Sequence, residues 1–282
     1  MMRTGKLKRT VRLAFINGVF IVICLFALIP ILYTVSVSLN AQNDVVSSSF
    51  SFIPRELTFE NYRRILFEMP FGRWFFNTAL LSVATVAVSL CISVPAAYAF
   101  SRRRFAGRRS LLYILLLLNA FPGILSMFAV YYLLQPLGLV NSYLGLILIY
   151  TGTMGIFGLW NMKGYFDTIP EEIEEAGKID GATDFQLVVK IVLPLARPSI
   201  IVTAVMILIY VWNEYIFAVT FMTGAEKYTL AAGLYSLQAT EYTRNWPVFS
   251  AAALLVSLPI LIIFFAVQRH MASGLTAGGV KG

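Results

Sequence analysis

The chain has 282 residues, of which 59% are hydrophobic and 13% charged, and its formal net charge is +8. A soluble domain carries about a quarter charged residues, so this chain has too few polar side chains to cover a water-facing globule. Its basic residues cluster beside long apolar runs, as in the cytoplasmic flanks of membrane spans, which argues against a nucleic-acid-binding protein.

Six apolar stretches are long enough to cross a bilayer, which takes about 20 mostly apolar residues. The first follows a basic leader, but it exceeds the apolar run of about 7–15 residues found in a signal peptide, so we expect a retained helix. Four stretches contain a proline that is expected to kink a helix, namely Pro30, Pro95, Pro122 and Pro259. The predicted spans are residues 14–38, 74–100, 110–134, 142–166, 199–222 and 248–268.

These spans predict an all-α integral membrane protein with a single six-helix domain at 14–268, between tails at 1–13 and 269–282. Six spans place both termini on the same side of the membrane. If that side is the cytoplasm, 16 Lys and Arg residues fall in inside segments or at the inner end of a span, and 6 fall in outside segments. Cytoplasmic loops carry an excess of basic residues, so we expect both termini in the cytoplasm.

The loop between the first two spans is predicted to contain a short amphipathic helix. Its apolar residues recur at helical spacing with charged residues between them, and they are Phe59, Tyr62, Ile65 and Leu66. A helix of this kind is expected to lie on the outer membrane surface.

Residues 167–198, between the fourth and fifth spans, interrupt the hydrophobic pattern and hold seven of the 14 acidic residues. Two helix starts are expected there, because Thr168 with Glu171 and Thr183 with Gln186 both have the spacing of a capping box. The loop is therefore predicted to fold into two short helices at the cytoplasmic face.

Within this loop, Glu174 and Lys178 are spaced to form an i,i+4 ion pair on the first helix. Gly181 falls between the helices, where a sharp bend needs a residue without a side chain. The second helix is expected to pack one apolar face against the spans, formed by Phe185, Val188, Val189 and Val192. Periodicity alone leaves two interpretations open, a docking surface for another protein and a structural connection.

A Glu-Ala-small triplet at Glu175, Ala176 and Gly177 is followed after three residues by Gly181 and after nine more by Ile191-Val192-Leu193-Pro194. This arrangement resembles the cytoplasmic signature of binding-protein-dependent ABC import permeases. The resemblance implies the type I ABC importer permease fold, in which the first helix of this loop is the coupling helix and sits in a cleft of the ATPase subunit. A helix in such a cleft needs small residues on its contact face, which we expect from Ala176 and Gly177.

Further stretches resemble the carbohydrate-uptake branch of that family, in particular the maltose-type second permease. They are Thr58–Tyr62, Asn77-Thr78, the end of the second span from Tyr98 to Phe105, Trp212-Asn213-Glu214, and the tail from Gly274 to Gly282. The resemblance implies that the tail orders against the ATP-binding subunits through Gly274, Leu275, Thr276, Gly278 and Gly279.

Glu214 is the only ionisable residue well inside a predicted span. Such a residue is costly unless it faces the bundle interior or water. With Trp212 and Asn213 it could line a translocation pathway, since sugars bind through stacking and hydrogen bonds. It could equally make a structural polar contact that holds its helix to a neighbour.

The chain has no G-x-x-x-x-G-K-[ST] phosphate loop and no Cys or His cluster for a metal, so we expect ATP and Mg to be bound by partner subunits. The resemblance implies a homologous second permease, two copies of an ATP-binding subunit and an extracytoplasmic sugar-binding protein. The predicted function is import of a sugar, such as maltose or maltodextrin. The alternatives are the same machinery for another solute, such as a glycerol phosphodiester, and a polytopic membrane enzyme, which would need clustered acid, base or metal chemistry.

Overall fold

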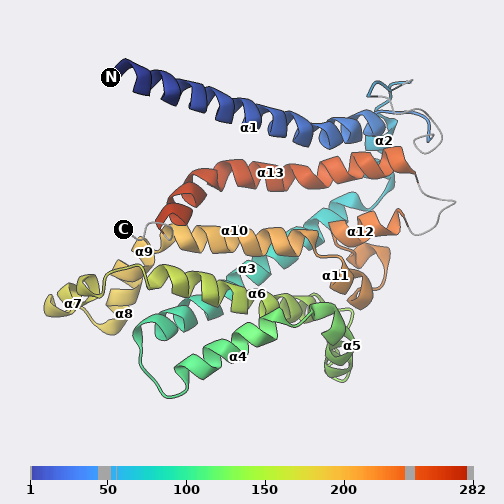
Figure 1. The fold of residues 1–282 in the computed structure, drawn as a ribbon. Coiled ribbons are helices and arrows are strands. Elements are labelled where there is room, and N and C mark those ends of the chain that lie inside the picture. The colour runs from blue at the N-terminus through green and yellow to red at the C-terminus, as the bar shows by residue number, and fades with distance from the viewer. Residues whose placement is uncertain (1, 44–51, 55, 239–244, 278–282) are drawn as a thin grey trace. The chain divides into compact units, whose positions relative to one another are not determined.

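The computed structural model describes residues 2–43, 52–54, 56–238 and 245–277, and most of these are helical (Figure 1). Within these ranges the only extended pairing is an isolated bridge between Asn40 and Leu57. The predicted all-α fold is therefore confirmed for the described part of the chain. Contacts divide the chain into two compact units, Met1–Met69 with Leu237–Val256, and Pro70–Ser236 with Ser257–Gly282.

The first unit contains the long N-terminal helix, a short helical segment and the beginning of the last helix. These are α1 (Met2–Ser38), α2 (Glu60–Arg63), the π-helical turn η1 (Arg64–Glu68) and the start of α13 (Trp246–Ala277). The apolar part of α1, Val11–Ser38, has a mean hydropathy of 2.8 in its most apolar window. It is thus long and apolar enough to cross a membrane.

The short amphipathic helix predicted between the first two spans is present as α2 and η1. Its apolar residues do not share one exposed face, because Ile65 is fully buried while Phe59 and Leu66 are exposed. Asn61 anchors the segment by donating to the carbonyls of Ser38 and Asn40, each at 2.9 Å. The expectation of a single face lying on a membrane was therefore wrong for Ile65, which faces the protein.

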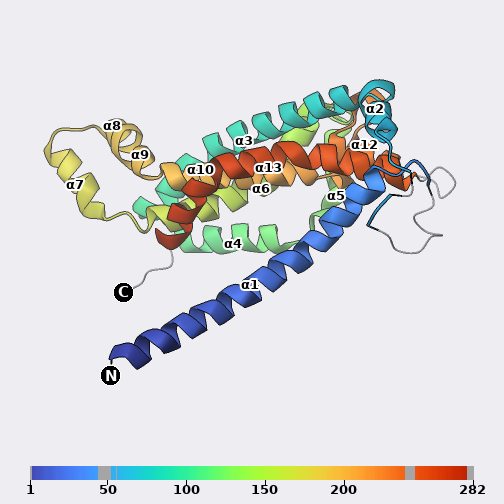
Figure 2. The same ribbon diagram turned by 90° about the horizontal axis from the view of Figure 1, so that it is seen from above.

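The second unit holds the remaining helices. They are α3 (Phe71–Arg102), α4 (Arg108–Ala120), α5 (Gly123–Leu134), α6 (Tyr143–Phe166), α7 (Glu171–Ile179), α8 (Asp184–Leu187), the π-helical turn η2 (Val188–Val192), α9 (Leu193–Leu195), α10 (Arg197–Asn213), α11 (Ile216–Phe221), the 3-10 turn η3 (Ala225–Lys227), α12 (Leu230–Ser236) and the end of α13. Helices α3, α6 and α10 pack against one another, and α7 to α9 lie at one end of α6 and α10 in both views (Figures 1 and 2).

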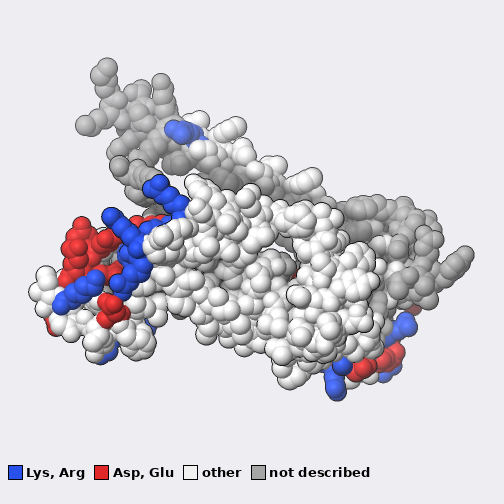
Figure 3. Space-filling model, turned by 90° about the horizontal axis from the view of Figure 1, so that it is seen from below, with Lys and Arg blue, Asp and Glu red and all other residues white. Residues whose placement is uncertain are grey.

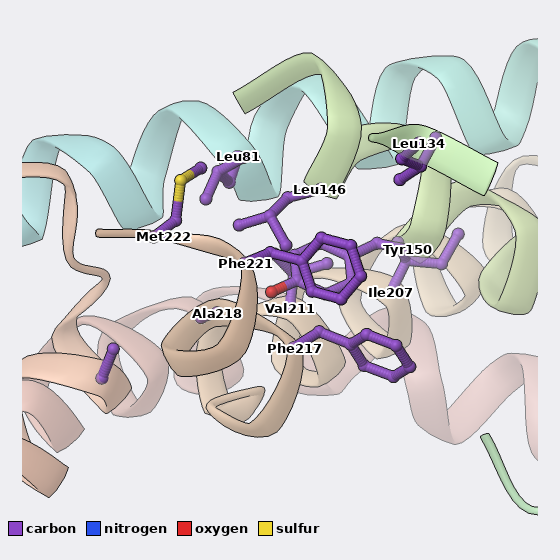
Figure 4. Close-up of a cluster of buried hydrophobic side chains, with 11 residues drawn as sticks. Leu81, Leu134, Leu146, Tyr150, Ile207, Val211, Phe217, Ala218, Phe221 and Met222 are labelled. Carbon is purple, nitrogen blue, oxygen red and sulfur yellow. The ribbon is translucent and has the colours of Figure 1, made fainter. Parts of the chain in front are cut away.

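A cluster of buried apolar side chains joins α3, α6, α10 and α11 (Figure 4). Tyr150 and Leu146 of α6 meet Ile207 of α10 and Phe221 of α11 there, and all four are almost completely buried. Burial of a large apolar side chain stabilises a fold by about 1.5–3 kcal/mol relative to exposure to water. Relative to lipid the gain is smaller and comes from close packing, because lipid tails are as apolar as these side chains. The cluster therefore fixes the central helices of this unit.

The third predicted span, residues 110–134, is not one kinked helix. Helix α4 ends at Ala120 and α5 begins at Gly123, and the two helix axes differ in direction by 97°. Pro122 precedes α5 in an extended conformation, with φ −60° and ψ 116°. The predicted mid-helix kink at this proline was therefore wrong, because Pro122 and Phe121 form a full break. Pro30, Pro95 and Pro259 do lie inside helices, as predicted.

The fifth predicted span, residues 199–222, is also interrupted. Helix α10 ends at Asn213, Glu214 is extended, and α11 begins at Ile216. Among the described residues four single helices are long and apolar enough to cross a membrane, and the number rises to six if each of two bent helix pairs counts as one span. The two pairs are α4 with α5, and the segment Asp184–Leu195 with α10, so the second pair does not coincide with the predicted span at 199–222.

The pair Asn77-Thr78 fastens the segment after α11 to helix α3. The Asn77 amide donates to the carbonyls of Glu226 and Tyr228, each at 2.9 Å. The Thr78 hydroxyl accepts from the backbone N–H of Leu230 at 2.8 Å, at the first residue of α12. These buried bonds explain why two polar residues stand near the start of an otherwise apolar helix.

Candidate functional site

The loop between α6 and α10 folds as two helical segments, as predicted, but its first helix is not capped by Thr168. Helix α7 begins at Glu171 after Pro170, and no side chain caps it. The Thr168 hydroxyl instead donates to the carbonyl of Tyr165 at 2.7 Å. Pro170 fits this position because its fixed φ suits the residue at a helix start and it has no N–H to leave unsatisfied. The Thr168–Glu171 capping box was therefore a wrong prediction.

The bend after α7 depends on Gly181, which has a φ of +83°. The N–H of Gly181 donates to the carbonyl of Lys178 and the N–H of Ala182 to that of Gly177, both at 3.0 Å. These two bonds make a Schellman motif, which ends a helix on a residue in the left-handed region. Glycine is favoured there because it has no Cβ, and the predicted role of Gly181 in the bend is confirmed.

The second helical segment begins with the predicted capping box. The Thr183 hydroxyl accepts from the N–H of Gln186 at 3.3 Å, and the Gln186 side chain accepts from the N–H of Thr183 at 2.9 Å. These bonds satisfy two of the donors that a helix start leaves free.

The face that this segment packs inward matches the predicted one only in part, since Val192 is buried and Val188 half-buried as expected. Leu187 and Val192 are fully buried, whereas Phe185 and Val189 are exposed, Phe185 by 75%. The π-helical turn from Val188 to Val192 changes the helical register within the segment. A face extrapolated from Phe185 at regular α-helical spacing was therefore wrong for Phe185 and Val189.

The signature triplet does not present all its residues to one side. Glu175 and Ala176 are exposed, but Gly177 is buried. A Cβ at Gly177 would lie 2.6 Å from Leu187 Cδ2 and 2.8 Å from Ile191 Cδ1. Gly177 thus lets α7 approach the second segment of its own loop, and the prediction that it adds to the contact face with a partner was wrong.

The end of the signature lies where the loop joins α10. Ile191 and Leu193 are half-buried, and Pro194 is exposed near the start of the three-residue helix α9. Leu193 packs against a small apolar cluster that includes Phe166 of α6 and Ala97 of α3. The segment Asp184–Leu195 then meets α10 at an angle of 74°. Within the loop the structure thus brings together Gly177 and Ile191, while Glu175, Ala176, Gly181 and Pro194 lie on its surface.

The last turn of α3 holds the loop through a buried ion pair that the sequence did not indicate. Arg102 Nε lies 2.6 Å from Glu174 Oε1, and the two side chains are only 8% and 7% exposed. The predicted Glu174–Lys178 pair is absent from the described ion pairs, since Glu174 points to α3 and Lys178 is exposed. Next to it Arg103 binds Asp184 at 2.6 Å on the surface, and this hydrogen bond raises the pKa of Arg103.

Four large apolar side chains on α7, α8 and η2 are exposed. Ile179 is the most exposed at 87%, on the last turn of α7, between Lys178 and Asp180 in the sequence. Figure 3 shows acidic and basic side chains gathered at the end of the unit that carries these helices. We call the set the loop surface, and it consists of Ile173, Ile179, Phe185 and Val189.

Glu214 occupies the break between α10 and α11. Its carboxylate accepts from the Tyr150 hydroxyl at 2.6 Å and from the N–H groups of Phe217 and Ala218 at 2.9 and 3.2 Å. It thus satisfies free donors at the start of α11, as a helix cap does. These contacts fit the interpretation of Glu214 as a structural polar contact between helices. Its role in a translocation pathway remains a prediction.

The two residues before Glu214 face different surroundings. Trp212 is 4% exposed, and its ring meets Phe75 edge-on at 5.7 Å between centroids. Asn213 is exposed and donates to the carbonyl of Ile209 in its own helix at 2.8 Å. The three residues therefore do not share one polar-aromatic surface in this chain.

The last helix continues into the predicted tail. Helix α13 includes Gly274, Leu275 and Thr276 and ends at Ala277, whereas Gly278 and Gly279 lie outside the described residues. The expected contact of this tail with ATP-binding subunits stays a prediction. Among the described residues no group of three or more His, Cys, Asp or Glu side chains could hold a metal ion.

Residues 89–276 match the protein family described as binding-protein-dependent transport system inner membrane component. Curated relatives extend the match over the whole chain. A galactooligosaccharides transport system permease protein of Bacillus subtilis is 35% identical, over 100% of both chains. A maltodextrin transport system permease protein of Streptococcus pneumoniae is 34% identical, over 98% of both.

Solved structures share the fold. A chain of a bacterial ABC transporter involved in the import of the acidic polysaccharide alginate matches with a TM-score of 0.76 and 28% identity, over 91% of this chain and 95% of that one. A chain of a methionine ABC transporter in inward-facing conformations matches with a TM-score of 0.55 and 19% identity, over 71% of this chain and 93% of that one. The second likeness concerns the fold alone.

Proposed function

Because this chain belongs to the family of binding-protein-dependent transport inner membrane components, we propose that it is the membrane-spanning permease subunit of an ABC importer for oligosaccharides. The observation that carries the proposal is the match over the full length of the chain to a galactooligosaccharide permease at 35% identity. The maltodextrin relative and the alginate structure also concern sugar polymers. The cargo is therefore a short chain of sugar units, such as a maltodextrin or a galactooligosaccharide.

The proposed machine contains a second, homologous permease, two copies of an ATP-binding subunit and an extracytoplasmic sugar-binding protein. The ATP-binding subunits bind ATP and Mg and hydrolyse the ATP, and this chain serves transport without an ATPase site of its own. An alginate transporter has been solved with a periplasmic protein that holds an alginate pentasaccharide, which supports the sugar-binding protein in this composition.

The loop surface is the proposed docking site for an ATP-binding subunit. Exposed apolar side chains such as Ile179 and Phe185 cost little in a free loop but gain by burial in a partner's cleft. The acids Glu171, Glu172 and Glu175 beside them add a charge pattern that favours a basic rim on the partner. On this proposal α7 is the coupling helix.

The test is ATP-dependent uptake into proteoliposomes by the complete complex, with radiolabelled maltodextrin and galactooligosaccharide as probes. Uptake of either sugar that requires the binding protein and ATP is expected. A complex that hydrolyses ATP and retains its binding protein but takes up neither sugar would overturn the oligosaccharide assignment.

Docking is tested by Phe185→Glu in the same complex. A charge in the partner's cleft is expected to cost about 2 kcal/mol or more, as at an interface hot spot, and to lower co-purified ATP-binding subunit by about tenfold or more. The matched control is Phe67→Glu in η1, since Phe67 is exposed by 79% and Phe185 by 75%. Equal recovery of the ATP-binding subunit with both variants would remove the loop surface from the interface.

The orientation that we propose places both termini and the loop at 167–198 in the cytoplasm. Cysteine at Ala225 or at Ser48, which is outside the described residues, should then react with a membrane-impermeant thiol reagent in intact cells. Cysteine at Ala106 should stay unlabelled, and the two native cysteines must first be replaced because both are exposed. The opposite pattern would reverse the orientation and remove the docking proposal.

A further inference from the structure

Arg102, the last residue of α3, makes two bonds to the loop and one to the preceding residue of its own helix. Its Nε binds Glu174 Oε1 at 2.6 Å, and its terminal nitrogens donate to the carbonyl of Ile169 at 2.7 Å and to the Ser101 hydroxyl at 3.3 Å. The guanidinium fork thus holds a carboxylate on α7 and a carbonyl just before α7 at once. A single ammonium group could not reproduce this geometry.

The carboxylate of Glu174 is held from a second position on α3. Its other oxygen accepts from the Tyr98 hydroxyl at 2.8 Å, and Tyr98 precedes Arg102 by one helical turn. Both side chains of the ion pair are more than nine-tenths buried, so water does not compete for these bonds. Hydrogen bonds to charged groups in such a place are stronger and more directional than those of exposed pairs. We call this arrangement of Tyr98, Arg102 and Glu174 the α3–α7 link.

Apolar packing holds the same region. Ile169 and Phe166, which lead into α7, pack with Ala97 of α3 and with Val192 and Ala196 of the following segment. The ring of Tyr98 meets that of Phe166 edge-on at 6.0 Å between centroids. The first half of α7 is thus fixed to α3, while Ile179 in its last turn stands free.

The covalent path from α7 to the next long helix is less direct. It runs through the bend at Gly181, the exposed start of α8 and the 74° turn into α10. The α3–α7 link passes through none of these three features, because it directly joins residues that are 72 positions apart in the sequence. The link therefore joins α7 to α3 by a contact that does not pass through α10.

We propose that Arg102 is the positioning residue that makes α3 move together with α7, so that movement of a docked ATP-binding subunit passes into the membrane through α3. The inference rests on the proposed function, in which α7 is the docked helix. The inference adds a route for this movement through the second span, α3. The loop signature by itself indicates a route through the fifth span, where the signature ends.

The test measures how strongly the sugar-loaded binding protein stimulates ATP hydrolysis by the complete complex in liposomes. If α3 carries movement between the membrane and α7, a broken link should weaken the stimulation of hydrolysis by the binding protein as well as transport. For Arg102→Met we expect the ratio of stimulated to unstimulated hydrolysis to fall at least about fivefold, the lower end of typical coupling. ATP-binding subunits should still co-purify, because the loop surface is untouched.

The matched control is Arg103→Met, one residue further on. It removes an ion pair of the same length, Arg103 to Asp184 at 2.6 Å, but its side chains are 55% and 65% exposed. Exposed pairs contribute little, so this variant should keep the wild-type stimulation ratio. An equal fall of the stimulation ratio in Arg102→Met and Arg103→Met would overturn the role of Arg102. Removal of any positive charge at this end of α3 would then be enough to lower the ratio.

Arg102→Met leaves Glu174 buried without its cation, and the variant could fail to assemble. Arg102→Lys covers this case, since lysine keeps the charge but loses the fork to Ile169. It should assemble, lower the stimulation ratio and speed amide exchange in the first turns of α7. Wild-type stimulation in Arg102→Lys, or in an assembled Arg102→Met, overturns the role of the link. A wild-type complex without sugar uptake would instead overturn the proposed function, which separates the two failures.

Discussion

Replacing Gly181 tests whether the shape of the loop depends on backbone conformation alone. Its φ is +83°, and a Cβ built on it meets no atom within 4 Å. An alanine there would meet no steric obstacle from neighbouring residues. Its backbone would still adopt the left-handed conformation, which costs about 1–2 kcal/mol for a residue with a Cβ. We therefore predict that Gly181→Ala shifts the equilibrium between the closed and opened bend by about 5–30-fold.

The effect can be measured by amide hydrogen exchange on a peptide covering the bend. The N–H groups of Gly181 and Ala182 exchange only when their bonds to Lys178 and Gly177 open. Exchange should therefore quicken by about the same 5–30-fold in Gly181→Ala. It should quicken less in Gly181→Asn, because asparagine adopts this conformation more easily than alanine. Gly181→Asp would add a charge beside Asp180 and is expected to weaken docking as well.

Gly164→Ala is the matched control for this substitution. Gly164 lies inside α6 without a positive φ, and a Cβ there also meets nothing within 4 Å. It should leave exchange at the bend unchanged and slightly stabilise its own helix. The reasoning would be refuted by wild-type exchange in Gly181→Ala, or by exchange in Gly181→Asn that is as fast as in Gly181→Ala.

Three other changes address the remaining predictions. Ala176→Arg places a long charged side chain on the exposed face of α7 and should reduce co-purified ATP-binding subunit without lowering the amount of inserted permease. Glu214→Gln removes the charge that caps α11 and accepts from Tyr150, so assembled complex should decrease. Normal assembly with lost uptake would instead place Glu214 in the pathway. Deleting residues 274–282 should impair assembly or regulation of hydrolysis, and wild-type uptake and hydrolysis after the deletion would end that idea.

The sequence alone determined the class of protein and the local form of its loop. Composition requires lipid as part of the solvent, and the apolar lengths locate the four unbroken spans but not the breaks in the third and fifth. The Thr183–Gln186 capping box and the bend at Gly181 were predicted correctly because both depend on interactions between residues at most five positions apart. The loop signature indicated the family for a similar reason, since it is a fixed spacing along the chain.

Features that depend on competition between near and distant partners could not be predicted in this way. Lys178 was the nearest cation to Glu174, but an i,i+4 pair on an exposed helix contributes only about 0.2–0.5 kcal/mol. The tertiary fold offers Glu174 the buried Arg102 and Tyr98 instead, from 72 and 76 positions away. No pattern in the sequence indicates whether the Glu174 carboxylate binds Lys178 on its own helix or Arg102 and Tyr98 on α3.

The direction of side chains on the loop was likewise decided by tertiary packing. Gly177 and Ala176 are adjacent small residues, yet only Gly177 faces Leu187, because α7 approaches the second segment along that side. Phe185 points outward because η2 shifts the register between it and Val192. Periodicity fixes which residues share a face only while the helix stays regular, and a π-helical turn removes that condition.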